Sequence, residues 1–168
     1  MFALVVLVGC GNKDTLPFGE SAIEAATRKV VNKPEGKLVQ ADRDRVTVID
    51  VREKKITDVG TLASFTHLEE LDLGANQLTD VSGLKELTLL KKLNLGGNQL
   101  SSLDGLEGLV NLEELHLNSN QLTDVTVLEG LKKLAVVNLH YNTNLTRSNI
   151  DKLQKALPKC KIMHSVEK

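Results

Sequence analysis

The sequence predicts an α/β solenoid: a right-handed superhelix of five 22-residue repeats, with parallel strands on its concave face and a helical cap at each end. Three observations lead to this fold class. One apolar frame recurs every 22 residues, the composition is 41% hydrophobic but only 2% aromatic, and both ends of the frame are irregular. A chain with so few aromatic residues must build its core from many similar layers of Leu, Val and Ile, as repeat proteins do.

The apolar frame begins at equally spaced positions, namely Val46, Leu68, Leu90, Leu112 and Leu134. In the third copy it reads L-x-x-L-x-L-x-x-N-x-L, and the second and fourth copies keep the same positions. This pattern resembles the consensus of leucine-rich repeats, and the resemblance implies that each copy adds one strand to a parallel sheet. We therefore predict repeats over residues 46–147 and a sheet of five strands.

The positions between the leucines divide into exposed and buried sets. The x-L-x-L stretch alternates with period 2, so its leucines should point into the core and its other residues onto the concave face. A planar amide at the end of each strand can pair turn backbone groups that would each cost about 1–3 kcal/mol if buried without a partner. We expect this structural role, and no ligand role, for Asn76, Asn98, Asn120 and Asn142.

An N-terminal cap is predicted over residues 21–45. Ser21 and Glu24 have the spacing of a capping box that starts a helix, and Pro34 ends it. Apolar residues at helical spacing should form its inner face: Ile23, Ala26 and Val30. The segment from Ile23 to Leu38 resembles the helical cap of internalin-like bacterial leucine-rich-repeat proteins, which implies that the helix covers the first repeat.

A C-terminal cap is predicted over residues 148–168. Its helix should start at Ser148, continue through Ala156 and end at Pro158. Its inner face should contain Ile150, Leu153 and Leu157, so that it covers the last repeat. Cys160 follows among apolar residues, and we expect it to be buried as a small hydrophobe.

The N-terminal residues have the features of an export signal. Residues 2–9 form an uncharged apolar run that is too short to span a bilayer as a helix. The run ends in Leu7-Val8-Gly9-Cys10, which resembles the lipobox of bacterial lipoproteins. The resemblance implies a signal peptide over residues 1–9, lipid attachment at Cys10 and a polar tether over residues 10–20. A buried N-terminal strand is the alternative interpretation.

Composition argues against several classes of function. The net charge is -1, from 21 basic and 22 acidic residues without a basic block, so we expect no nucleic-acid partner. Cys10 and Cys160 are the only cysteines, which argues against a disulfide framework and a thiolate metal site. No spacing of nucleophile and base, metal ligands or phosphate loop is present, so we predict a non-enzyme without a cofactor or a metal.

Two kinds of surface are predicted on the concave face. In the first, acidic and basic residues alternate between copies, with Lys91 flanked by Glu69 and Glu113, and Lys92 flanked by Glu70 and Glu114. Such exposed pairs contribute about 0.2–1 kcal/mol each, and the ladder largely neutralises itself. Towards the C-terminus the face becomes polar and contains the one tyrosine, a residue type enriched at binding hot spots. We predict partner binding there, by His116, Asn118, His140 and Tyr141.

These features together predict a protein-binding module of the bacterial cell envelope. We expect a monomer that reaches the membrane only through a lipid at Cys10 and binds a protein with its concave face. A cytosolic regulatory subunit that docks on an enzyme such as a phosphatase is one alternative. A purely structural envelope scaffold is the other.

Overall fold

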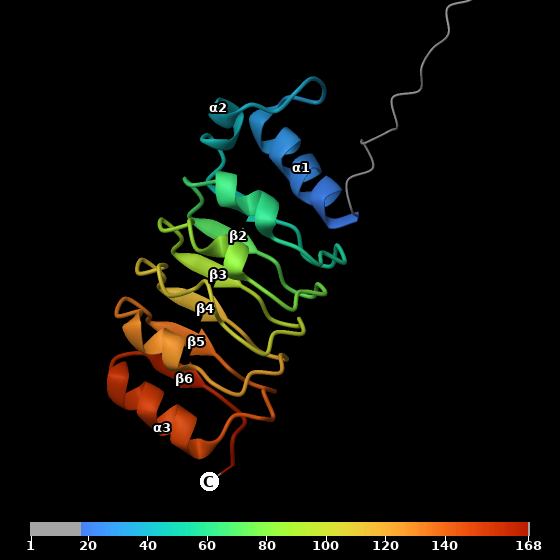
Figure 1. The fold of residues 1–168 in the computed structure, drawn as a ribbon. Coiled ribbons are helices and arrows are strands. Elements are labelled where there is room, and N and C mark those ends of the chain that lie inside the picture. Colours follow the sequence, from blue (N-terminus) through green and yellow to red (C-terminus); the bar gives the residue numbers. More distant parts are fainter. Residues whose placement is uncertain (1–17, 168) are drawn as a thin grey trace, which may run out of the picture.

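The structure is a computed structural model that describes residues 18–167 of the chain. It is an elongated stack, with helix α1 (Phe18–Val31) across one end and helix α3 (Arg147–Ala156) across the other (Figure 1). The short helix α2 (Gln40–Arg43) lies between α1 and the first strand. The predicted signal peptide and Cys10 lie outside the described residues.

The stack contains one parallel sheet whose strands follow one another in chain order. The strands are β1 (Val48–Asp50), β2 (Glu70–Asp72), β3 (Lys92–Asn94), β4 (Glu114–His116), β5 (Val136–Asn138) and β6 (Lys161–Met163). From β1 to β5, every residue pairs with the residue 22 positions further along, as Val48 does with Glu70. The sequence period is therefore the register of the sheet, and the prediction of an α/β solenoid is confirmed.

The prediction of a five-stranded sheet is wrong by one strand, because the C-terminal cap contributes β6. After α3, the Lys161 N–H donates to the Ala135 carbonyl at 2.8 Å, and Val136 pairs with Lys161. Cys160 is buried and Ile162 packs half-buried against the core, two positions apart as on one face of a strand. The strand has only three residues, and its spacing from β5 differs from that of the repeats. The sequence pattern therefore does not reveal it.

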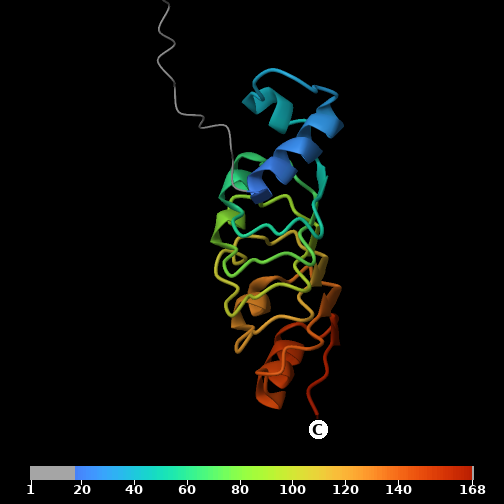
Figure 2. The ribbon, with the colours of Figure 1, turned by 90° about the vertical axis from the view of Figure 1, so that its right-hand side faces the viewer.

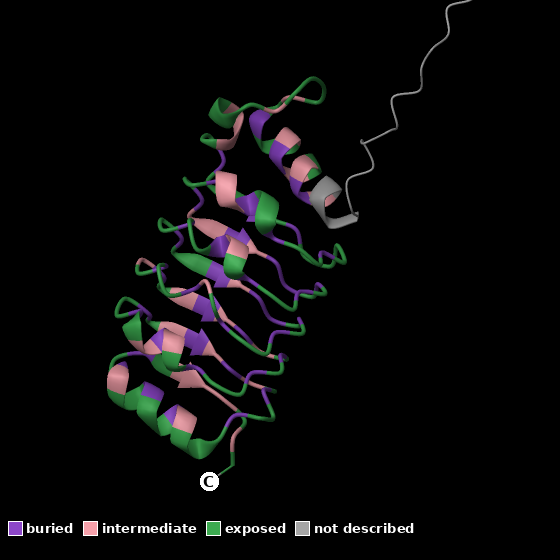
Figure 3. Ribbon diagram, viewed as in Figure 1, coloured by how far each residue is buried: buried purple, intermediate pink, exposed green. Residues whose placement is uncertain are grey.

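The core is a continuous column of aliphatic side chains, seen as buried positions repeated from layer to layer in Figure 3. Every apolar position of the frame is at most 5% exposed, from Val46 in the first copy to Leu145 in the last. Strand residues alternate as predicted, since Leu71 and Leu93 are buried between more exposed neighbours. The face formed by those neighbours is called the strand face below.

The side opposite the strands is made of turns and short 3-10 helices: η1 (Gly60–Ser64), η2 (Ser82–Leu84) and η3 (Thr126–Gly130) (Figure 2). An aspartate precedes each of them and accepts a backbone N–H: Asp58 from Gly60, Asp80 from Ser82 and Asp124 from Thr126. Hydrogen bonds from the following Ser or Thr lower the pKa of Asp80 and Asp124. Each aspartate therefore fixes the turn that leads into its 3-10 helix.

The N-terminal helix differs from the prediction in its start and in its buried face. It begins at Phe18, so Ser21 lies within the helix and is not its N-cap. Val30 is 51% exposed, whereas Thr27 is fully buried and donates its hydroxyl to the Ile23 carbonyl at 2.8 Å. This intrahelical bond satisfies the threonine hydroxyl. The buried face of the helix therefore contains Ile23, Thr27 and Val31 in place of Val30. The helix ends before Pro34, as predicted.

The C-terminal helix also starts earlier than predicted, with Thr146 as its N-cap. The Thr146 hydroxyl accepts the Asn149 N–H at 3.3 Å, and Asn149 reaches back to the Thr146 N–H. Its predicted inner face is confirmed, because Ile150, Leu153 and Leu157 are buried. Cys160 is 5% exposed, and burial raises the pKa of its thiol, so the prediction of a buried small hydrophobe is also confirmed.

Candidate binding surface

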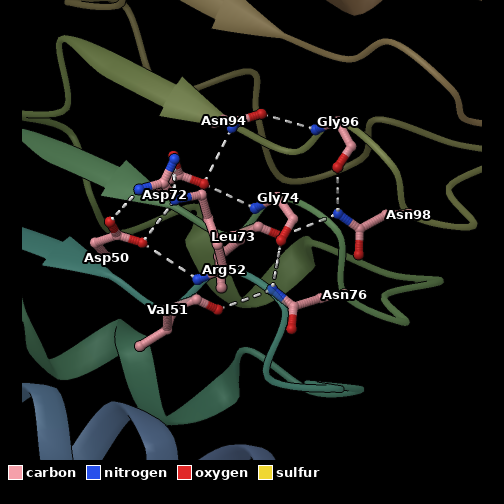
Figure 4. Close-up of polar contacts among 10 residues, drawn as sticks. All are labelled: Asp50, Val51, Arg52, Asp72, Leu73, Gly74, Asn76, Asn94, Gly96 and Asn98. Atoms are coloured by element: carbon pink, nitrogen blue, oxygen red, sulfur yellow. Dashed lines mark hydrogen bonds and ion pairs between the residues drawn. The ribbon is translucent and has the colours of Figure 1, made fainter.

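The four frame asparagines fix the ends of the strands. Asn98 accepts the Leu78 N–H at 3.0 Å through Oδ1, and its Nδ2 donates to the carbonyls of Leu73 and Leu95. Figure 4 shows the bond to Leu73. Asn76 makes the equivalent bonds one copy earlier. Each amide thus connects its own turn to that of the preceding copy. The structural interpretation of these residues is confirmed, and they hold the strand face in register.

A polar network covers the first strands on the strand face. Arg52 contacts Asp50 at 2.7 Å and Asp72 at 3.5 Å, and Asn94 donates to Asp72 at 3.0 Å (Figure 4). The guanidinium lowers the pKa of Asp50, and the carboxylate in turn raises the pKa of Arg52. Asp72 also accepts the Gly74 N–H at 2.9 Å. These side chains are therefore largely occupied with one another.

The charged ladder is only partly as predicted. Lys91 bonds to Glu69 at 2.7 Å and Lys92 to Glu70 at 2.9 Å, and both contacts raise the pKa of the lysine. Each lysine therefore turns to the glutamate of the preceding copy. Glu114 instead lies 2.8 Å from His116. Because the paired lysine side chains are about half exposed, at 49% and 54%, each pair contributes no more than about 0.2–1 kcal/mol.

A shallow groove of about 300 Å³ runs over strands β1 to β4 on the strand face. Charged and amide side chains dominate its exposed lining, which includes Asp50, Asp72, Lys92, Asn94, Glu114 and His116. Of the four predicted binding residues, His116 alone is among the residues that line this groove. His116 is therefore the point at which the groove meets the predicted site.

The structure connects three of the predicted residues, His116, Asn118 and His140, through Asn138. This asparagine donates to Asn118 Oδ1 at 3.3 Å, accepts the His140 N–H at 3.1 Å, and pairs with His116 in the sheet register. Asn138 was not among the predicted site residues, although its place in the same column as His116 was a signal for it. These residues form a connected polar surface.

Tyr141 completes this surface at its outer edge. Its ring lies 6.0 Å from the ring of His140 between centroids, and the residue is 68% exposed. Its φ of 60° is left-handed, and its N–H donates to the Ser165 hydroxyl at 2.9 Å. No feature of the sequence indicated the contact with Ser165. The C-terminal segment therefore helps to fix the backbone that presents the tyrosine.

Within residues 18–167, no group of three or more His, Cys, Asp and Glu side chains is arranged to hold a metal ion. Over the same residues, no helix has the length and hydropathy needed to cross a membrane.

The comparison with known families agrees with this geometry. The model of leucine-rich repeats, two copies in length, matches residues 44–86, 88–130 and 110–155. These matches cover well over half of the chain. The chain belongs to the leucine-rich-repeat family. Leucine-rich-repeat proteins are in general protein-interaction modules. The comparison with curated proteins finds no match to this sequence.

Solved structures of bacterial leucine-rich-repeat proteins are similar to this one. An internalin (inlF) from Listeria monocytogenes is 26% identical with a TM-score of 0.78, over 93% of this chain and 48% of that chain. A leucine-rich-repeat protein of Leptospira interrogans is 26% identical with a TM-score of 0.67, over 75% and 33%. The internalin J domain from Listeria monocytogenes, at 17% identity and a TM-score of 0.65, shows the fold alone.

The similarity makes this an internalin-like leucine-rich-repeat protein of bacterial type. The chain spans about half the length of the internalin, at 48%, and a third of the Leptospira protein, at 33%.

Proposed function

We propose that the chain is a non-enzymatic protein-binding module of the bacterial cell envelope, anchored through a lipid at Cys10. The strand face binds the partner, and the site lies towards the C-terminal repeats. The partner is a protein, and the chain acts as a monomer. General support comes from the family, whose members are protein-interaction modules.

One observation carries the placement of the binding site. Tyr141 is the most exposed large hydrophobic residue of the described chain, at 68%, and it lies at the edge of the polar surface around Asn138. An exposed aromatic ring beside adaptable amide and imidazole groups is typical of a binding hot spot. The ladder of Lys91 and Lys92 is already paired with glutamates, so a partner would first have to displace those contacts.

The site makes a direct prediction about binding. Changing His116→Ala together with Tyr141→Ala should weaken the partner's affinity by about tenfold or more, because truncating an energetically important interface residue costs more than about 1 kcal/mol and tenfold corresponds to about 1.4 kcal/mol. The partner is first identified by photo-crosslinking from position 141, and its affinity is then measured by calorimetry. Since Tyr141 is exposed and His116 is half-buried, the urea midpoint should change little.

The matched control is the double change Lys91→Ala with Lys92→Ala, on the same face and of the same number of residues. It should weaken binding less than the His116 and Tyr141 pair. If the lysine pair had the larger effect, the binding site would be the charged ladder. If neither pair mattered, the strand face would not be the binding surface.

A separate prediction concerns the anchor. Cys10 follows the apolar run Phe2 to Gly9 and has the position of the lipid-bearing cysteine of a lipobox. Bacterial cells that express the full chain and are fed labelled palmitate should incorporate label into the wild type but not into Cys10→Ser. Cys160→Ser is the control and should keep the label, because that thiol is buried. Label in Cys10→Ser, or none in the wild type, would exclude lipid attachment at Cys10.

A further inference from the structure

A second, larger groove lies at the N-terminal end of the stack, whereas the proposed binding site lies towards the C-terminal repeats. Helix α1 forms one wall and strand β1 with the turn after it forms the other, and the groove has a volume of about 860 Å³. Its lining includes Ala22, Ala25, Ala26, Lys29, Val30, Val48, Lys54 and Lys55. A volume of this size is within the range of ligand-binding clefts in proteins.

The floor of this groove is the open edge of a sheet. β1 is the first strand in the order, so within the described residues it pairs with a strand on one side only, that of β2. Val48 is 47% exposed at this edge. An edge strand offers a row of backbone N–H and C=O groups to any other extended chain that approaches it. An extended peptide can make backbone hydrogen bonds to this edge, whereas a lipid chain cannot make them.

The helical wall is shaped to leave room beside that edge. Three alanines, Ala22, Ala25 and Ala26, line it, and their short side chains keep the helix backbone close to the groove without filling it. Val30, 51% exposed, extends the wall as an apolar surface. Such a wall favours small or β-branched apolar side chains in the occupant, because burial of their apolar area is the main gain available there.

The rim of the groove is basic. Lys29 comes from α1, and Lys54 and Lys55 come from the turn after β1; none of the three forms an ion pair with another described residue. Lys54 occupies the frame position at which later copies have their buried asparagine. In the first copy, no earlier repeat offers a backbone carbonyl to which an asparagine amide could donate. The Lys54 backbone N–H still donates to Asn76 Oδ1, at 3.0 Å. The turn is thus held in place while its lysine side chain is available to a ligand.

We propose that this groove binds an extended peptide that adds a strand to the edge of β1, with apolar side chains against the alanine wall and carboxylates at the lysine rim. Strand addition supplies affinity through main-chain hydrogen bonds, and the pockets and charges beside the edge supply specificity. The lining has three lysine side chains but only one acidic side chain, Glu53, that forms no ion pair with another described residue. This excess of positive charge favours an acidic over a basic peptide. This site is independent of the binding surface proposed for the strand face.

The test uses three synthetic nonapeptides with blocked ends and the purified chain. The first is Glu-Glu-Val-Thr-Val-Thr-Val-Glu-Glu, the second has Lys in place of every Glu, and the third has Pro in place of the central Val. Calorimetry at low salt should show the glutamate peptide binding at least about tenfold more tightly than the other two. In NMR spectra, the amide signals of Val48 and Asp50 should shift more than those of β6, the other edge of the sheet.

Two variants then separate the groove from general electrostatic attraction. Lys54→Glu should weaken the glutamate peptide by about tenfold, whereas Lys85→Glu, the same charge change outside the groove, should leave the affinity unaltered. Ala25→Phe should fill the groove and also weaken binding, and its urea midpoint should stay at the wild-type value because Ala25 is exposed.

Several outcomes would overturn the proposal. These are equal binding of the glutamate and lysine peptides, no binding of either, and amide shifts confined to strands β3 to β6. Equal effects of Lys54→Glu and Lys85→Glu would mean that the net charge of the chain, and not the groove, attracts the peptide. A wild-type dimer that Ala25→Phe converts to a monomer would assign the groove to a second copy of the chain.

Discussion

Replacing Leu95 with alanine is expected to lower the free energy of unfolding by about 2–5 kcal/mol. Leu95 lies in the central copy and is 0% exposed, with buried leucines of the neighbouring copies above and below it. Truncating its isobutyl side chain to a methyl group would leave a cavity that the backbone cannot close, because Leu95 N–H is bonded to His116 O at 2.8 Å. The urea midpoint at constant denaturant slope measures the loss.

Asn94→Ala is the matched control, one residue earlier in the chain, where β3 ends. Asn94 is half-buried on the strand face and would lose bonds to Asp72 and to the Gly96 N–H, at a cost of about 0.5–1.5 kcal/mol each. Leu95→Ala should therefore be the more damaging change. The reverse ranking would mean that the inward and outward positions of the strands are assigned incorrectly.

The second large effect is expected from Asn98→Ala. The Leu78 N–H, which Asn98 Oδ1 accepts at 3.0 Å, would remain buried without a partner, at a cost of about 1–3 kcal/mol. The carbonyls of Leu73 and Leu95 would each lose one donor but keep a second, from Asn76 and Asn120 respectively. Thermal or urea unfolding of the variant should show the loss, with a midpoint well below that of the wild type.

Two further variants make this prediction specific to the amide. Asn98→Asp keeps the acceptor for Leu78 but replaces the donating NH₂ by a charged oxygen facing two carbonyls, so it should also destabilise the fold. Gln99→Ala, at an exposed neighbouring position, should have an effect within about 0.5 kcal/mol of zero. An Asn98→Ala variant as stable as Gln99→Ala would contradict the structural role of the asparagines.

The repeat was predictable because one physical constraint acts on every copy. Each strand from β1 to β5 buries an aliphatic residue equivalent to Leu93, and from β2 on it is followed by an amide equivalent to Asn98, so residues 22 apart have the same environment. The ends obey other constraints. Thr27 is buried because a hydroxyl can bond within its own helix, and an apolar pattern does not register that possibility. β6 has a spacing of its own, since Val136 pairs with Lys161.

The candidate binding surface was predictable in its positions but not in its contacts. The shared column of His116 and Asn138 follows from the period of the repeat. The contacts of Glu114 with His116 and of Lys92 with Glu70 depend on side-chain rotamers. Exposed residues have several rotamers of similar energy, so the sequence does not determine which contact forms. The contact of Tyr141 with Ser165 joins segments with no common period.

The sharing of each strand-end carbonyl between two asparagines has a consequence for the order in which the molecule folds. Leu73 O receives one amide from its own copy and one from the next, so a newly added copy docks on groups already in place. Contacts reach only about one repeat back along the chain, which keeps the loop-closure entropy of each step small. Such a chain can assemble progressively as it leaves a ribosome or a membrane channel, without waiting for its far end.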